Sequence, residues 1–172
     1  MFDDYVYPLF PLVHQPSIHE MLETGAYNDN PAFLRRCLAL CAITVASAPN
    51  REKQVCTGHY STYQAFVSRA CDLVVMSRMA TDPTWDDEPS FESAIDSTLL
   101  SMACHYADRN KRGWVFANEA ILIIRDLQLH KPEGLSRLTP ADSERWMMRS
   151  SRRCHTYSPG FLHVTRTGKL WI

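Results

Sequence analysis

A histidine followed directly by a glutamate, His19-Glu20, is the first pair in this sequence whose residue types could do chemistry. The same pair opens the His-Glu-x-x-His motif, in which two histidines one helical turn apart bind zinc and the glutamate acts as a general base. Here the second histidine is missing, because Glu23 stands in its place. We therefore interpret His19 and Glu20 as surface residues of a helix.

Cysteines are the next candidates, for metal or redox chemistry, and lie at Cys37, Cys41, Cys56, Cys71, Cys104 and Cys154. No two form a Cys-x-x-Cys pair, and a binuclear zinc cluster needs closely spaced cysteines with basic residues among them. Cys37 and Cys41 lie one helical turn apart, but their segment is apolar and no histidine is near in sequence. We expect reduced cysteines packed as small hydrophobic residues, with no metal site and no cofactor in this chain.

Other catalytic patterns are incomplete. The consecutive carboxylates of Asp86, Asp87 and Glu88 lie in a loop bounded by prolines, where a solvated surface is the simpler interpretation. No Gly-x-Ser-x-Gly motif occurs, and the glycines from Gly160 to Gly168 are too widely spaced for a phosphate-binding loop. The sequence therefore predicts no catalytic residues.

Histidines keep one alternative function open. His14, His59 and His105 are acid/base candidates for a small helical enzyme or ligand-binding protein that uses a pocket between helices. None of them belongs to a recognisable paired constellation. An enzyme should fold alone and turn over a substrate, whereas a regulatory fragment should expose an apolar face and bind a partner.

A basic turn and a proline pair offer two further, weaker signals. The basic residues of this turn, Arg109, Lys111 and Arg112, precede Trp114 and could contact a nucleic-acid backbone. Three positive charges in an otherwise acidic region are, however, a weak indication of nucleic-acid binding. We interpret them as a turn that links two helices. Pro8-x-x-Pro11 could bind an aromatic groove, yet its apolar spacers favour burial.

Length and composition are typical of one globular domain. The chain has 172 residues, of which 45% are hydrophobic and 22% charged. Its longest mostly apolar run, residues 37–48, is shorter than the roughly 20 residues of a membrane helix. Asp3 and Asp4 stand where a secretory signal carries positive charge, so we expect no signal peptide and a cytosolic or nuclear protein.

Charge is distributed unevenly along the chain. Residues 1–144 hold 12 basic and 19 acidic side chains, a net charge of −7, whereas residues 145–172 hold six basic and no acidic ones. From about residue 147 helical periodicity also ends. We predict a folded region at 1–146 and a basic, irregular and poorly ordered tail at 147–172.

Helices are the elements that must position these residues. Asn30-Pro31 is an N-cap followed by a first-turn proline, and it predicts a helix that ends near Ser47. Further helices are predicted at about 59–78, from Ser90 to Tyr106, at about 112–127, and from Thr139-Pro140 onward. Strand-like alternation is scarce, so we predict an all-α fold, an antiparallel helical array like an irregular bundle or solenoid.

An N-terminal proline strap precedes the helices at residues 7–16, Tyr-Pro-Leu-Phe-Pro-Leu-Val-His-Gln-Pro. Each proline fixes its own φ and pushes the preceding residue toward extended geometry, which disfavours both helix and central strand. Burying each large apolar side chain contributes about 1.5–3 kcal/mol. We expect Leu9, Phe10, Leu12 and Val13 to pack against the helical core.

A second segment, about a hundred residues later, runs from Gly113-Trp114 through Ala117 and Ala120 to Leu127-Gln-Leu-His-Lys at 127–131. This run of small and apolar residues ends in a Leu-x-Leu-His-basic signature. Together with the strap, and in the same order and spacing, it resembles the fungal-specific transcription factor domain, the middle homology region of fungal binuclear-zinc-cluster regulators. The resemblance covers residues 2 to about 146, roughly the first half of such a domain.

The resemblance implies structural roles for the strap residues Pro8, Phe10, Pro11, His14 and Pro16. Phe10 would pack against the helices that follow, and Pro11 and Pro16 would hold the strap extended. His14 would be a satisfied packing residue rather than a ligand.

The resemblance also implies structural roles in the second segment, for Gly113, Trp114, Ala120, Leu127, Leu129 and His130. Ile121 and Ile124 would join Leu127 and Leu129 in the core, and His130 and Lys131 would suit the negative end of a helix. Gln128 stands where the family pattern has glycine, so the residue that favours a left-handed cap is missing.

The basic tail is the second departure from the family pattern, which continues after Trp146 into a helix with bulky aromatics. We interpret the chain as a truncated member, or the product of a shifted reading frame or retained intron. The zinc cluster of the family, and the zinc it holds, are then expected only outside this chain.

By resemblance the chain is a regulator of transcription in a fungal nucleus, tied to metabolic or secondary-metabolite genes. Its partner would be another protein or the rest of a transcription factor, with homodimerisation as a further option. We expect no specific DNA binding by this chain alone, because no recognition module is present, and no membrane binding.

Overall fold

The computed structural model describes residues 2–8, 12–48, 59–81, 90–138, 163–164 and 170–171. Long helices form its body: α2 (Pro31–Ser47), α4 (Tyr63–Thr81), α5 (Phe91–Tyr106) and α6 (Asn110–Asp126). Shorter elements accompany them: the π-helical turn η1 (Phe2–Val6), α1 (Gln15–Glu23), the 3₁₀ turn η2 (Ala26–Asn28), α7 (Pro132–Leu135), and strands β1 (His163–Val164) and β2 (Leu170–Trp171). The fold is all-α, as the sequence predicts.

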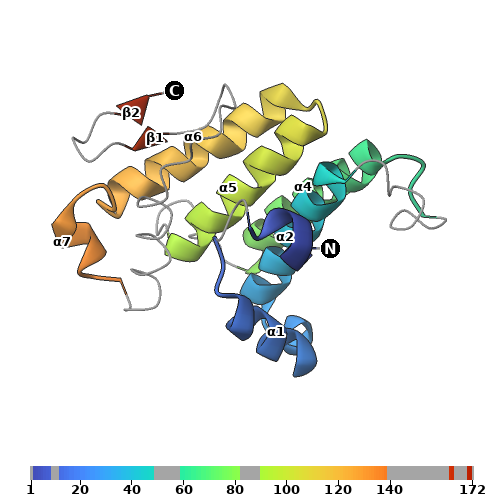
Figure 1. Ribbon diagram of the computed structural model, residues 1–172, viewed down its shortest axis with the longest axis horizontal. Helices are drawn as coiled ribbons and strands as arrows, with labels where there is room; N and C mark the ends of the chain where they lie inside the picture. Colours follow the sequence, from blue (N-terminus) through green and yellow to red (C-terminus); the bar gives the residue numbers. More distant parts are fainter. Residues whose placement is uncertain are drawn as a thin grey trace.

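The long helices pack in a consistent order (Figure 1). Helix α2 packs against both α4 and α5, which contact each other much less, and α6 packs against α5. Only Ala107, Asp108 and Arg109 join α5 to α6, so these two helices run antiparallel. Helix α2 therefore lies between α4 and α5, and α6 extends the array beyond α5.

Side-chain caps begin two of the long helices where the sequence predicts. The Asn30 side chain accepts a hydrogen bond from the Phe33 amide at 3.0 Å, and Ser90 Oγ accepts one from the Ser93 amide at 3.1 Å. Such caps each stabilise a helix by about 1 kcal/mol. The helix predicted at 59–78 begins later, at Tyr63, and the helix predicted from Thr139 lies outside the described residues.

Left-handed residues end α5 and α6 without glycine. Gln128 has a φ of 54° and follows α6; its amide bonds to the Arg125 carbonyl at 2.9 Å, and the Leu129 amide bonds to the Ile124 carbonyl at 3.0 Å. This is the Schellman arrangement, and it brings Leu129 into the same buried cluster as Ile124. The cap therefore forms although glycine is missing, because burial of Leu129 offsets the strain at Gln128.

Two buried clusters make up the core. The larger joins α2, α4 and α5 around fully buried side chains such as Ile43, Val74 and Leu99. The smaller lies where α5 begins and α6 ends and consists of Ala94, Ile123, Ile124 and Leu129. The helices thus enclose one principal core and a smaller second one, to which α6 contributes Ile123 and Ile124.

The proline strap is confirmed in part. Leu12 and Val13 are buried in the larger cluster, as predicted, while Leu9, Phe10 and Pro11 lie outside the described residues. The expectation that Pro16 holds the strap extended is wrong, because α1 begins at Gln15 and Pro16 occupies its first turn. A first-turn proline loses no helical hydrogen bond, so the strap turns directly into a helix there.

The predicted tail contains a short strand pair that the sequence does not predict. β1 and β2 pair antiparallel, with His163 opposite Trp171 and Val164 opposite Leu170. The other residues of the tail lie outside the described part of the chain. Among the described helices, none combines the length and apolar character of a membrane span.

Candidate functional site

A buried ion pair joins α2 to α5. Arg36 and Asp96 are each only 4% exposed, and Arg36 Nε donates a hydrogen bond to the Asp96 carboxylate. Arg36 Nη2 donates to the backbone carbonyl of Glu92 at 2.9 Å and also pairs with the Glu92 carboxylate. Burial alone lowers the pKa of Arg36, but the charges of Asp96 and Glu92 outweigh it and raise that pKa, so the guanidinium stays charged.

A second buried arginine joins α4 to α5 and α6. Arg78 is 2% exposed; it pairs with Glu119 of α6, and its Nη2 donates to Ser97 Oγ of α5 at 3.1 Å. Arg78 also acts electrostatically on Asp96, so the two arginines share one polar region. We call Arg36, Arg78, Glu92, Asp96, Ser97 and Glu119 the arginine network.

The arginine network holds helices together rather than performing acid/base chemistry. It contains side chains from α2, α4, α5 and α6, and a guanidinium does not release its proton in proteins. Sequence analysis missed it. The signal was a charged residue at a core position of an apolar helix, since Arg36 lies among Phe33, Leu40 and Ile43. A charge in such a position implies a buried partner.

Two buried thiols meet between α4 and α5. Cys71 Sγ of α4 lies 3.6 Å from Cys104 Sγ of α5, and the two residues are 0% and 1% exposed. The hydrogen bond between the thiols, and then burial, raise the pKa of Cys71. The same hydrogen bond lowers the pKa of Cys104 against the opposing effect of burial, and the positive charges of Arg112 and Arg109 lower that pKa further.

Glycine lets α6 approach the thiol pair. A Cβ on the buried Gly113 would lie 3.2 Å from the Ser101 carbonyl oxygen and 3.4 Å from Cys104 Cβ. The next residue back, Arg112, pairs with Asp72 of α4 at 2.7 Å. Gly113 and Arg112 therefore bring α6 and a positive charge to the side of the pair.

The other cysteines fit the sequence interpretation only partly. Cys37 is half-buried, and burial raises its pKa to about 11, so it stays protonated near neutral pH. Cys41 was expected in the core but is exposed, because it falls on the outer side of α2. Cys56 and Cys154 lie outside the described residues.

Metal binding does not fit the donors that the structure describes. No group of three or more cysteine, histidine, aspartate or glutamate side chains comes together within the described ranges. A zinc cluster needs four ligands around each ion, whereas Cys71 and Cys104 form only a pair. The described residues therefore offer no complete set of ligands for zinc.

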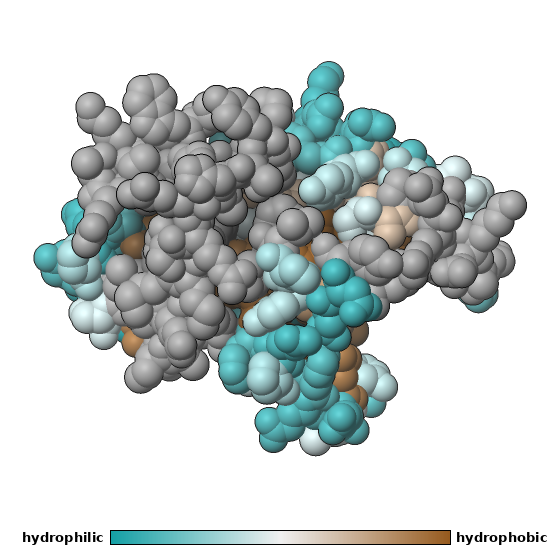
Figure 2. Space-filling model, viewed as in Figure 1, coloured by the Kyte–Doolittle hydropathy of each residue, from teal (hydrophilic) through white to brown (hydrophobic). Residues whose placement is uncertain are grey.

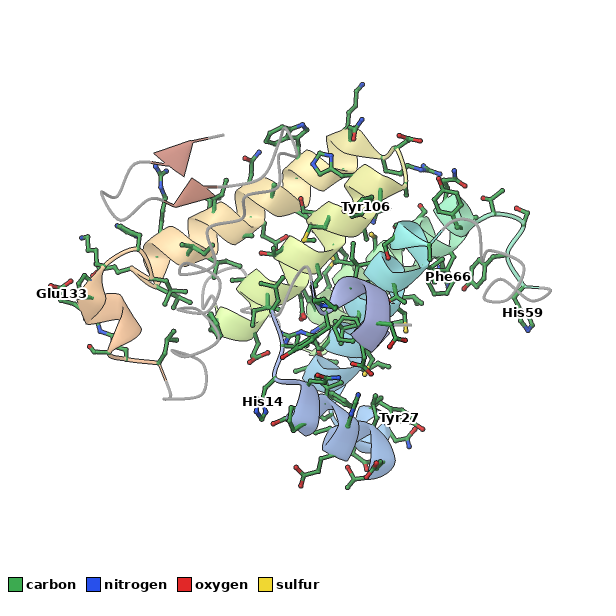
Figure 3. All side chains as sticks on the ribbon, viewed as in Figure 1. His14, Tyr27, His59, Phe66, Tyr106 and Glu133 are labelled. Atoms are coloured by element: carbon green, nitrogen blue, oxygen red, sulfur yellow. The ribbon has the colours of Figure 1, made fainter. Side chains whose placement is uncertain are left out.

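The three histidines proposed for acid/base chemistry have separate surroundings. His14 is exposed and its Nδ1 lies 2.7 Å from Ser17 Oγ, whereas His105 Nδ1 lies 3.0 Å from Asn110 Oδ1. His59 is exposed, and Figure 3 shows it at the right edge of the molecule, whereas His14 lies at the lower centre. The structure does not bring these histidines together.

The predicted surface pair near the N-terminus is also exposed. His19 Nε2 lies 3.2 Å from Asp3 Oδ2, and Glu20 is exposed on the same helix. Figure 2 shows that the lower end of the molecule, where α1 lies, presents mainly hydrophilic residues.

The residues of the family-like motifs divide between core and surface. Pro8, His14 and Pro16 are exposed in the strap region, and Phe10 and Pro11 lie outside the described residues. In the second segment, Gly113, Ala120 and Leu129 are buried, Leu127 is half-buried, and Trp114 and His130 are exposed. The rings of Trp114 and His105 make an edge-to-face contact, with their centroids 5.9 Å apart.

Large apolar side chains are exposed on α6. Trp114, Val115 and Leu122 are 41%, 64% and 58% exposed. Val115 and Leu122 are two helical turns apart and so lie on the same side of the helix. We call these three residues the α6 outer row; exposed Lys111 and Arg125 flank it along the chain.

Comparison with known families gives one match. The family described as "Fungal specific transcription factor domain" matches residues 1–155. Neither a curated protein nor a solved structure matches the chain.

Proposed function

Because the chain belongs to the fungal specific transcription factor domain family, we propose that it is a regulatory domain that controls a transcription regulator through protein contacts. The match over residues 1–155 is the observation that carries this proposal. In this proposal the domain has no catalytic role.

The α6 outer row is the surface that would bind the partner. Its three apolar side chains would be covered by an apolar stripe of similar spacing, such as one side of a helix. Lys111 adds positive charge at the N-terminal end of the row, near the exposed Arg109; at the other end Arg125 lies beside the exposed Asp126, which offsets its charge. The partner that fits is therefore an acidic segment with interspersed apolar residues, the composition of many activation segments.

This contact would restrain the activation segment. An activation segment held on α6 would have its apolar residues covered and unavailable to the transcription machinery. In this proposal the chain acts in the nucleus, controls metabolic or secondary-metabolite genes, and leaves DNA reading to a separate module. It uses no zinc of its own.

A reporter assay in a fungal cell tests the proposal. The full chain is placed between a heterologous DNA-binding module and an acidic activation segment, and compared with a flexible linker of equal length. We expect severalfold lower reporter output with the chain than with the linker. Equal output from the two fusions would contradict the proposal.

Charge placed on the α6 outer row should release this restraint. The double variant Val115→Asp, Leu122→Asp is expected to restore most of the reporter output. The two new carboxylates would face the acidic segment in the contact and would oppose its docking. Met79→Asp is the matched control, since Met79 is an equally exposed apolar residue on α4. Release by Met79→Asp to the same extent would show that the α6 outer row is not the surface involved.

A further inference from the structure

The thiols of Cys71 and Cys104 are in direct contact, close enough for a bond to form between them. Their sulfur atoms are 3.6 Å apart, and a disulfide bond of about 2.05 Å requires an approach of only about 1.5 Å. Cys71 lies in the middle of α4, and Cys104 lies two residues before the end of α5. The two helices contact each other little elsewhere, because α2 separates them.

We propose that Cys71 and Cys104 are a redox-active pair, which a peroxide converts to an intramolecular disulfide that ties α4 to α5. This chemistry is independent of the proposed regulatory function. It is a property of the folded chain, and it can be tested without DNA, a partner or a cell.

Cys104 is the sulfur that reacts first. The two thiols share a hydrogen bond, and the positive charges of Arg112 and Arg109 favour formation of a thiolate at Cys104. The half-buried Cys37 has the opposite character, because burial raises its pKa to about 11. Peroxide should therefore select Cys104 over Cys37.

The reaction balances in two steps. The Cys104 thiolate attacks one oxygen of the peroxide and breaks the O–O bond, which yields a sulfenic acid and releases an alcohol or water after protonation. Cys71 then gives up its proton, its sulfur attacks the sulfenic sulfur, and water leaves as the disulfide forms. Two thiols lose two electrons in all, and the peroxide accepts them.

Arg112 connects the buried pair with solvent. Its side chain is about one-third exposed, and it pairs with Asp72, the residue next to Cys71. Arg112 also acts electrostatically on both thiols. In the proposed reaction, a small peroxide reaches the buried pair when the Arg112–Asp72 ion pair separates.

Disulfide mapping tests the proposal on the complete, reduced chain. The protein is treated with hydrogen peroxide in slight excess, blocked with an alkylating agent under denaturing conditions, digested and analysed by mass spectrometry. We expect a cross-linked peptide pair that contains Cys71 and Cys104. We also expect the melting temperature to rise by roughly 5–10 °C, because the bond closes a loop of about 33 residues in the unfolded chain.

Variants separate this reaction from general oxidation. The double variant Cys37→Ser, Cys41→Ser should still form the cross-link, and Cys71→Ser should leave a sulfenic acid on Cys104 that dimedone traps. Arg112→Gln should slow the cross-link severalfold, whereas Arg125→Gln, an exposed arginine on the same helix, should not.

Disulfide mapping of the chain without substitutions tests the proposal even if Cys71→Ser fails to fold. Recovery of Cys71 and Cys104 as alkylated thiols after peroxide treatment would overturn the proposal. A cross-link that joins either of them to another cysteine would overturn it as well.

Discussion

Two helices in this protein end at a residue with strained, left-handed backbone. Asp108 and Gln128 both adopt left-handed backbone, with φ values of 57° and 54°. For residues other than glycine this conformation costs about 1 kcal/mol, although aspartate tolerates it better than glutamine does. The cost is offset where the next residue is buried, as Leu129 is.

Gln128→Gly is expected to stabilise the chain by about 0.5–1 kcal/mol, because glycine removes the left-handed strain without disturbing the turn. Urea unfolding measures the change. Asp108→Gly is the matched comparison at the end of α5, and it should gain less. A loss of stability in Gln128→Gly would show that the amide side chain contributes more than the strain costs.

At the scale of elements, buried charges connect helices whose residues are far apart in the sequence. Arg36 connects α2 to α5, and Arg78 connects α4 to α5 and α6. Replacing a whole buried ion pair with apolar residues is often neutral, whereas removing one partner costs about 3–5 kcal/mol. The arginine network therefore adds specificity to the array more than net stability.

Asp96→Asn is expected to destabilise the chain by about 3 kcal/mol, because it leaves the buried Arg36 guanidinium with only Glu92 as a charged partner. Glu92→Gln should cost less than about 1 kcal/mol, since the Glu92 side chain is half exposed. Chemical denaturation of both variants checks the contrast. Equal losses would mean that burial does not decide the strength of these pairs.

At the scale of the whole molecule, apolar clusters and buried ion pairs close the core. The described donors assemble no site for a metal ion, and the cysteines at the centre form a pair rather than a tetrahedral set. Zinc-dependent modules of small size unfold when the metal is removed, because binding free energy is folding free energy. A chain that folds by burying apolar side chains should stay folded when metal is removed.

Dialysis against a strong chelator is expected to leave the melting temperature of the full chain unchanged within about 1 °C, because a core of this size folds by apolar burial. Differential scanning calorimetry before and after dialysis provides the measurement, with a zinc-finger peptide as the positive control. A large drop that added zinc reverses would contradict the prediction that zinc belongs outside this chain.

Local chemistry explains which features of the fold could be predicted from the sequence. Asn30 and Ser90 cap amides only three residues away, and apolar periodicity needs no knowledge of distant segments, so helix starts and the all-α class could be predicted. The family resemblance followed in the same way from motif residues in the right order, and the match over residues 1–155 confirms it.

Only the tertiary structure decided which distant side chains meet. Arg36 lies 60 residues from Asp96, Arg78 lies 41 from Glu119, and Cys71 lies 33 from Cys104. Each contact depends on the register between two helices, which the packing of all their neighbours sets together. The left-handed turn at Gln128 has the same origin, because burial of Leu129 outweighs a local preference for glycine at the position before it.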